Sequence, residues 1–196
     1  EYIQGGIRVP DFYRQFGQKL AHVHKMTSRS FGLDHNNYIG SLPQYNHHHD
    51  HWPDFFIEER IRPQLKMARD AGAVRQKHAR QFDQLFHQLD GFFPEEPPAL
   101  VHGDLWGGNH IVDNSGEPCI LDPAVYFAHR ETDIAFTHMF GGFDKKFYEG
   151  YNEVYPLANG FEERIDVYNL YPLMVHVNLF GGGYLASVES ILQRFA

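Results

Sequence analysis

The stretch from residue 99 to residue 122 interrupts a chain that otherwise repeats apolar residues at helical spacing. Ala99–Val101 is a short apolar run, and a glycine-rich polar segment follows it. His110–Val112 and Cys119–Leu121 flank the turn sequence Asp-Asn-Ser-Gly, a pattern typical of a β-hairpin, and Asp122 follows the second strand. The sequence therefore predicts a small β element set into a mainly helical molecule.

Helical periodicity dominates on both sides of this element. After Pro10 the residues Phe12, Phe16, Leu20 and Val23 recur at helical spacing. Further helices are expected over Phe55–Arg69, around Phe82–Leu89, and within Phe143–Tyr155, Phe161–Phe180 and Tyr184–Phe195. Pro63 is expected to kink the second helix, and the stretch from Thr27 to His51 is expected to be a loop. The predicted fold class is α+β, mostly helical.

Composition excludes several classes of function. The formal charge of −8 and the pI of about 5.9 argue against a nucleic-acid-binding protein, which needs a basic surface. The longest apolar stretch, Leu170–Phe180, is shorter than the roughly 20 residues that span a bilayer, so no membrane segment is expected. The single cysteine, Cys119, cannot form an internal disulfide, which favours a reducing compartment and a cytoplasmic location.

Three polar residues of the β element have the chemistry of phosphoryl transfer. Asp104 and Asn109 are separated by four residues, and Asp122 follows the hairpin. The kinase signature H-R-D-x-x-x-x-N has the same spacing of His, Asp and Asn, with Gly103 here in place of Arg. In such enzymes one Asp accepts the hydroxyl proton, while Asn and a second Asp hold Mg²⁺.

Two other interpretations compete with this one. Asp and Asn beside glycine are also ordinary turn formers, although the hairpin and the Asp at its exit make that reading the weaker one. A metal-dependent hydrolase could instead use Asp104 and Asp122 together with histidines. Hydrolysis without ATP that survives an Asn109→Ala substitution would favour the hydrolase.

The residues around these motifs resemble the fructosamine kinase (ketosamine-3-kinase) family, which belongs to the aminoglycoside-phosphotransferase-like kinases. The resemblance covers nearly the whole chain. It rests on residues 101–109 (VHGDLWGGN), 120–124 (ILDPA), 40–44 (GSLPQ), 59–64 (ERIRPQ), 139–143 (MFGGF) and 180–184 (FGGGY). It implies the C-terminal lobe of a protein-kinase-like fold that phosphorylates a sugar hydroxyl of a ketosamine, with ATP and Mg²⁺ as cofactors.

The resemblance also implies roles for single residues. Asp104 is expected to be the catalytic base, and Asn109 and Asp122 the Mg²⁺ ligands. His102 is expected to fix the loop backbone with its ring, without transferring protons. Asp133 resembles the helix aspartate that hydrogen-bonds the catalytic loop backbone in related kinases, although a plain helix N-terminal acid would look the same.

Trp106 is a possible wall of the sugar pocket, with a place in the core as the alternative. The acceptor is expected to be a small sugar-amine, and its identity and the oligomeric state of the protein stay open.

The first residues resemble the hinge between two kinase lobes. Glu1 and Ile3 would then offer backbone hydrogen bonds to adenine, with residues 1–9 as a linker and residues 10–196 as the C-terminal lobe. No G-x-G-x-x-G loop and no strand lysine of the N-terminal lobe are recognisable in the sequence. The alternative function is therefore a truncated, non-catalytic lobe that binds ligand without transferring phosphate.

The remaining features are expected to be structural. Adjacent histidines in His47–His51 lack the regular spacing of metal ligands, so this run is expected to be a solvated loop that binds metal only adventitiously. Cys119 is expected to be a small buried apolar residue of the hairpin. The pair Glu95–Glu96 is expected to be solvated, and His22 and His24 to be surface or packing residues.

Overall fold

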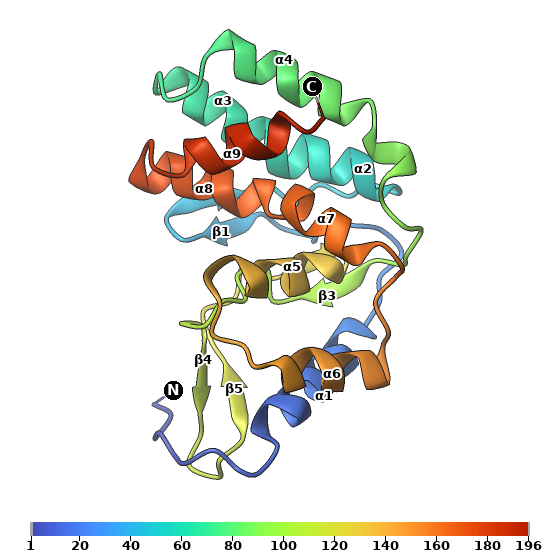
Figure 1. Ribbon diagram of the computed structural model, residues 1–196, viewed down its shortest axis with the longest axis vertical. Helices are drawn as coiled ribbons and strands as arrows, with labels where there is room; N and C mark the ends of the chain where they lie inside the picture. Colours follow the sequence, from blue (N-terminus) through green and yellow to red (C-terminus); the bar gives the residue numbers. More distant parts are fainter. Residues whose placement is uncertain (1, 196) are drawn as a thin grey trace.

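The computed structural model describes residues 2–195 as a mainly helical molecule with short antiparallel strand pairs (Figure 1). The helices are α1 (Phe12–His24), α2 (Trp52–Phe55), the π-helical η1 (Phe56–Ile61), α3 (Arg62–Asp70), α4 (Gln76–Phe86), the 3₁₀ turn η2 (Leu89–Gly91), α5 (Glu131–Phe140), α6 (Lys145–Val154), α7 (Phe161–Tyr168), α8 (Leu170–Phe180) and α9 (Leu185–Leu192). The strands are β1 (Asn37–Ile39), β2 (Leu42–Gln44), β3 (Ala99–Val101), β4 (His110–Val112), β5 (Pro118–Ile120) and β6 (Tyr126–Ala128). They pair as β1–β2, β3–β6 and β4–β5, and the predicted α+β class is confirmed.

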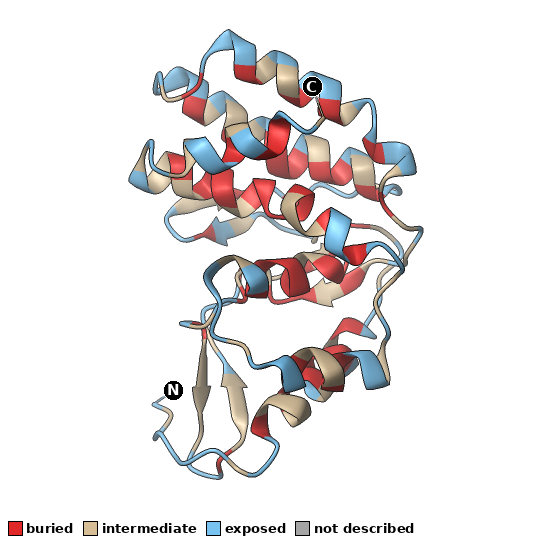
Figure 2. Cartoon of the chain, in the orientation of Figure 1, coloured by how far each residue is buried: buried red, intermediate tan, exposed pale blue. Residues whose placement is uncertain are grey.

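The elements lie in three tiers along the long axis (Figure 1). Helices α3, α4, α8 and α9 form one end, α5 and β3 lie in the middle, and α1 and α6 pack side by side at the other end beside the β4–β5 hairpin. Buried residues line the inward faces of the helices (Figure 2). None of the helices formed by residues 2–195 is long and apolar enough to span a bilayer.

The first helix shows how spacing creates the core. Phe12, Phe16 and Leu20 lie four residues apart and are each at most 3 % exposed. The next position of this stripe is His24, which is fully buried, whereas the predicted Val23 is only half-buried. The stripe predicted from periodicity is therefore confirmed over three positions and ends on a histidine.

The other predicted helices are also present. The residues within Phe143–Tyr155 form α6, and those within Tyr184–Phe195 form α9. The stretch Phe161–Phe180 is divided into α7 and α8, with Asn169 between them. Along the second helix, the expected disturbance at Pro63 takes the form of the π-helical turn η1 just before it, since proline has no N–H with which to continue the α-helical ladder.

The expected loop from Thr27 to His51 contains a hairpin, so this prediction is wrong in part. Strands β1 and β2 pair with Ile39 opposite Leu42, which leaves Gly40 and Ser41 as a two-residue turn. Gly40 has φ +57°, a conformation that glycine adopts without a steric penalty. The Gly-Ser pair between apolar residues was the available signal. The strands are only three residues long and carry polar residues, so alternation is barely visible.

The N-terminal segment lies along the β4–β5 hairpin. The Gly6 N–H donates to the Val112 carbonyl at 3.1 Å, and the Val9 N–H donates to the Gly116 carbonyl at 3.2 Å. A Cβ on Gly6 would lie 2.0 Å from the Asp113 carbonyl oxygen, so only glycine allows this approach. Residues 2–9 are thus held against the same hairpin that separates the two proposed metal ligands.

Candidate active site

The β3–β6 pair holds both ends of the candidate site. Residues 102–109 leave β3, and residues 121–125 return from the β4–β5 hairpin to β6, so the two segments meet at the same end of the antiparallel pair. The Ala124 N–H donates to the His102 carbonyl at 2.9 Å, and the Leu121 N–H donates to the Asn109 carbonyl at 3.1 Å. These bonds bring the loop of Asp104 and the loop of Asp122 together.

Gly103 allows the backbone to turn beneath Asp104. Its φ is +81°, and a Cβ at this position would lie 2.2 Å from the Ala124 carbonyl oxygen. Any side chain here would therefore strain the backbone and collide with the returning segment. This explains physically why glycine stands where the kinase signature has arginine.

His102 is a buried part of the loop scaffold. Its ring Nδ1 accepts the Asp104 N–H at 3.2 Å, and its Nε2 lies 3.0 Å from the Leu121 carbonyl oxygen. Because a carbonyl only accepts, Nε2 carries the hydrogen and the ring is the neutral tautomer. The ring thus bridges the two loops, in the way that the resemblance implies.

Asp104 is a half-buried carboxylate with an unusual proton affinity. Burial raises the pKa of Asp104 to about 7, and the nearby charges of Asp122 and Asp133 act in the same direction. The Asn109 Nδ2 opposes this rise by donating to Asp104 Oδ2 at 2.9 Å. A carboxylate with a pKa near neutrality suits a general base that works near pH 7.

Asn109 and Asp122 fit a site for a divalent cation. Asn109 is 6 % exposed, and both of its side-chain hydrogen bonds within residues 2–195 use Nδ2, which leaves Oδ1 to act as a ligand. Asp122 is exposed and has φ +54°, a left-handed conformation that aspartate tolerates better than most residues. Oxygen ligands from an amide and one or two carboxylates, completed by phosphates, are the usual Mg²⁺ set.

Asp133 supports the loop from behind. It lies in the first turn of α5, is 1 % exposed, and accepts the His102 N–H through Oδ2 at 2.7 Å and the Gly103 N–H through Oδ1 at 2.9 Å. Burial alone would raise the pKa of Asp133, but the hydrogen bonds from His24 and from the Gly103 N–H help to outweigh it, and the pKa lies below its usual value. Asp133 is therefore more than a helix N-terminal acid.

A cavity of about 350 Å³ opens in front of Asp104. Its walls are mostly aromatic or aliphatic and include Trp106, Phe136, Phe140, Phe180 and Tyr184. Trp106 is 40 % exposed, with its ring edge-on to Phe140 at a centroid distance of 6.2 Å, so it lies in the cavity wall and not in the core.

The glycines of the loop allow it to pack closely at this wall. Gly142 lies against Gly107, where an added Cβ would come within 3.0 Å of the Gly107 Cα. A Cβ on Gly108 would meet the Trp106 indole at 2.3 Å. The Trp-Gly-Gly-Asn loop and the Gly-Gly pair after α5 are thus one packed unit, although they lie more than 30 residues apart in the sequence.

The histidine run is paired with carboxylates. His47 Nδ1 and His49 Nε2 lie 3.0 Å and 3.1 Å from the two oxygens of Glu59, and His48 Nε2 lies 3.1 Å from Asp34 Oδ1. Within residues 2–195 no group of three or more His, Cys, Asp or Glu side chains is arranged to hold a metal ion. The run therefore ties its loop to η1.

Two further expectations are wrong in part. Cys119 lies in β5 as predicted but is half-buried, because the two-stranded hairpin is covered incompletely. Glu95 is exposed as expected, but Glu96 is only partly exposed and forms a bidentate ion pair with Arg130. Nothing in the local sequence distinguishes these two glutamates, since the partner is 34 residues away.

The sequence analysis also missed His24, which contacts Asp133 behind the loop. The signal was its place in the four-residue stripe of α1. Of the two residues proposed to bind adenine, Ile3 is half-buried in the segment before α1, and Glu1 lies outside the described residues.

Comparison with known proteins agrees with this geometry. Residues 1–196 match the family described as fructosamine kinase. A probable ketoamine kinase of Vibrio parahaemolyticus is 42 % identical over 94 % of this chain, and the chloroplastic protein-ribulosamine 3-kinase of Arabidopsis thaliana is 41 % identical over 92 %. The chain spans 64 % and 56 % of the lengths of these two proteins.

A solved structure has the same fold. A Thermobifida fusca protein described as a fructosamine-3-kinase superposes with a TM-score of 0.92 at 36 % sequence identity. The match covers all of this chain and 68 % of that one. Together with the sequence matches, it shows that this chain belongs to the fructosamine kinase family.

Proposed function

We propose that this chain carries the acceptor site and the catalytic base of a kinase that transfers phosphate from ATP to a sugar hydroxyl of a ketosamine. One observation carries the proposal: Asp104, with a pKa of about 7, lies at the wall of an aromatic cavity and is hydrogen-bonded to Asn109. The kinase names of the relatives support it and give no support to a non-catalytic lobe.

Asp104 is the proposed base. Its carboxylate would accept a hydrogen bond from the attacking hydroxyl and take the proton as the oxygen–phosphorus bond forms. The Asn109 Nδ2 bond to Oδ2 holds the carboxylate in one orientation and leaves Oδ1 for the acceptor. Most of the rate gain in phosphoryl transfer comes from such positioning and from electrostatics.

Asn109 Oδ1 and the Asp122 carboxylate are the proposed ligands of Mg²⁺. When bound, the ion would neutralise charge on the transferring phosphate. The hydrogen bonds of the buried Asn109 amide fix its oxygen before the ion arrives, whereas the Asp122 carboxylate is exposed to solvent. The Leu121–Asn109 backbone bond keeps the two residues at the same end of the hairpin.

The cavity suits a small sugar-amine acceptor. Trp106 and its aromatic neighbours offer flat faces for the C–H face of a sugar ring and for a cationic amine.

The proposed nucleotide contacts at Glu1 and Ile3 belong to the linker of residues 1–9, which would join the lobe of residues 10–196 to a second lobe. A single half-buried cysteine is compatible with the proposed cytoplasmic location.

Substitution of the base tests the proposal. In the complete protein, Asp104→Asn should lower kcat for a small ketosamine such as fructosyl-lysine by about 10²- to 10⁴-fold, while the affinity for MgATP changes little. Phosphorus NMR of the product gives the rate, and calorimetry gives the nucleotide affinity.

Asp34→Asn is the matched control, because that carboxylate is 96 % exposed and bonded only to His48 in the described chain. Turnover by Asp104→Asn at the wild-type rate would refute the assignment of the base. Ketosamine binding without any phosphorylation by the wild-type protein would instead establish the non-catalytic alternative.

A further inference from the structure

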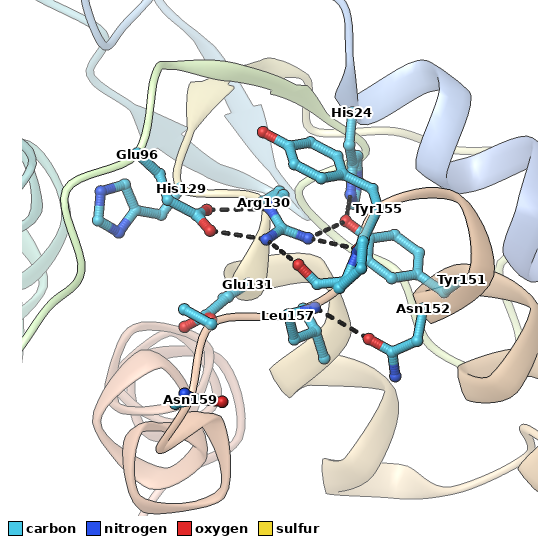
Figure 3. A network of polar contacts seen from close by, with 12 residues as sticks. His24, Glu96, His129, Arg130, Glu131, Tyr151, Asn152, Tyr155, Leu157 and Asn159 are labelled. Carbon is cyan, nitrogen blue, oxygen red and sulfur yellow. Dashed lines mark hydrogen bonds and ion pairs between the residues drawn. The ribbon is translucent and has the colours of Figure 1, made fainter.

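A line of buried polar contacts runs from Asp133, behind the catalytic loop, through α1 and α6 to the residue before α5. Asp133 Oδ2 lies 3.1 Å from His24 Nε2, and His24 Nδ1 lies 2.7 Å from the Tyr151 hydroxyl. The same hydroxyl lies 3.4 Å from Arg130 Nη1 (Figure 3). All four side chains are at most 2 % exposed, so water does not compete for these bonds.

The chemistry of the groups fixes the direction of two bonds in this line and allows Tyr151 to donate the third. Asp133 is ionised and only accepts, so His24 Nε2 carries a hydrogen. Arg130 only donates, so the Tyr151 oxygen accepts from it and the hydroxyl hydrogen is free to point at His24 Nδ1. The line is therefore satisfied from end to end with a neutral His24, and each member orients the next.

Arg130 provides a fixed end. Its guanidinium forms two bonds with Glu96, of 3.0 Å and 2.7 Å, and it donates to the carbonyl oxygens of Tyr155 and Pro156 at 2.8 Å and 2.7 Å. The guanidinium also lies 3.7 Å from the centre of the Tyr155 ring. With so many partners Arg130 has one available position, which is the property required of an anchor.

Close packing of α1 on α6 brings His24 and Tyr151 together. An added Cβ on Gly17 would lie 1.9 Å from the Phe147 carbonyl oxygen, and one on Gly150 would lie 2.1 Å from the Arg14 carbonyl oxygen. The two helices thus touch backbone to backbone at these glycines. Their contact places the last residue of α1 beside the Tyr151 hydroxyl.

We propose that His24 is a positioning residue for the catalytic loop, held in place by Tyr151 and Arg130. By donating to one oxygen of Asp133, it would orient the carboxylate so that both oxygens meet the His102 and Gly103 N–H groups. Those two amides precede Asp104. The consequence for catalysis rests on the proposed role of Asp104, whereas the effect on the loop does not.

The chain contains a matched pair that lacks this connection. His129 Nδ1 lies 3.0 Å from the Tyr168 hydroxyl, and both residues are 2 % exposed. Within residues 2–195 neither side chain has a hydrogen bond to the loop at 102–104. Loss of the Tyr168 hydroxyl therefore removes a buried tyrosine–histidine hydrogen bond, as loss of the Tyr151 hydroxyl does, without the proposed function.

Amide hydrogen exchange of the His102 and Gly103 N–H groups, followed by NMR, tests the proposal on this chain without ATP or acceptor. Tyr151→Phe should speed exchange of both amides about fivefold to tenfold, because it loosens His24 and through it Asp133. Tyr168→Phe should leave both amides within about twofold of wild type. Equal effects of the two variants, or no effect of Tyr151→Phe, would overturn the proposal.

A second set of variants separates positioning from folding. His24→Gln keeps an N–H near the position of Nε2 and should retain most of the protection, whereas His24→Leu should lose it. If His24→Leu does not fold, the Tyr151→Phe comparison still decides. If the two His24 variants fold and exchange alike, the donated bond is not the cause and the proposal fails.

The catalytic consequence is measured separately in the complete protein. Tyr151→Phe should lower kcat about threefold to tenfold with unchanged KM for both substrates, and Tyr168→Phe should not. Faster exchange with unchanged kcat would support the positioning of the loop by His24 and refute its consequence for catalysis. Unchanged exchange would refute the positioning itself.

Discussion

Two aspartates, one on each side of the loop backbone at residues 102–104, have pKa values shifted in opposite directions. On the cavity side, burial raises the pKa of Asp104 to about 7. On the inner side, Asp133 is more deeply buried, yet its pKa is lowered, with hydrogen bonds from His24 and from the Gly103 N–H acting against burial. The difference lies in the number of donors, since Asp133 receives two backbone N–H groups and one ring N–H, and Asp104 receives one side-chain amide.

This contrast separates the work of the two residues. A buried carboxylate whose two oxygens are both hydrogen-bonded by the protein stabilises the fold and is not available to a substrate. A carboxylate that is desolvated and short of donors destabilises the fold, but it is ready to take a proton or to approach a cation. Asp104 lies on the loop and Asp133 in α5, and Gly103, which precedes Asp104, donates its N–H to Asp133.

Among the residues of the candidate site, the largest effect on stability is expected at Asp133. Asp133→Asn removes a buried negative charge that accepts from three donors. The asparagine NH2 group is itself a donor and would face some of them, so the free energy of unfolding should fall by about 3 kcal/mol. Urea unfolding measures it. Asp166→Asn, in a half-exposed pair with Arg194, is the control and should change stability by less than about 1 kcal/mol. Similar losses at both sites would break the comparison.

Gly103→Ala should have the next largest effect. The positive φ and the 2.2 Å approach to the Ala124 carbonyl oxygen should together lower the free energy of unfolding by about 2 kcal/mol or more. Activity should fall with it, because the backbone on both sides of Asp104 must shift. Gly91→Ala is the control, since a Cβ there meets nothing within 4 Å. Thermal unfolding of the two variants, compared side by side, tests this.

The pH dependence of stability should reveal the opposite sign at Asp104. Its pKa is higher in the folded chain than in the unfolded chain, so the folded state keeps the proton longer and stability falls as pH rises from about 4 to about 7. Asp104→Asn removes this loss and should stabilise the protein at pH 8 by about 1–2 kcal/mol, after allowance for solvent around a half-buried group. At pH 4 the gain should vanish. A gain of equal size at both pH values would contradict the pKa assignment.

The smallest effect on stability is expected at Trp106. Because this side chain is 40 % exposed in the cavity wall, Trp106→Ala should cost less than about 1–2 kcal/mol, while Trp52→Ala, at 2 % exposure, should cost about 3–5 kcal/mol. Trp106→Ala should nevertheless weaken acceptor binding about tenfold, measured by calorimetry with a small ketosamine. Loss of stability without loss of affinity would place Trp106 in the core after all.

Much of the architecture could be read from local sequence. The four-residue stripe of Phe12, Phe16 and Leu20 predicts α1, and the turn residues between positions 112 and 118 predict the β4–β5 hairpin. The β1–β2 hairpin was missed because three-residue strands hardly show alternation. In β2 the buried position is occupied by a polar residue, Gln44, so the strand shows no apolar alternation. Gln44 can be buried because it accepts a hydrogen bond from Tyr171, 127 residues away.

The candidate site divides in the same way. Asp104 and Asn109 have the spacing of the kinase signature, and Asp122 follows the hairpin, so residue type and order were enough to select these three residues as candidates. The line from Asp133 through His24 and Tyr151 to Arg130 was not visible, because its members come from α1, α5, α6 and the residue before α5. A lone histidine in an apolar stripe looks like packing until its partners are known.

The sequence by itself determined the local features of the chain: the helices, the β4–β5 hairpin, and an aspartate and an asparagine five positions apart. Only the tertiary structure decided how those groups behave. Asp104 and Asp133 are the same residue type, and their pKa values move in opposite directions because burial and donor count are set by segments far away in the chain. Proton affinity depends on the local dielectric and on nearby charges, and both arise only when the distant segments pack together.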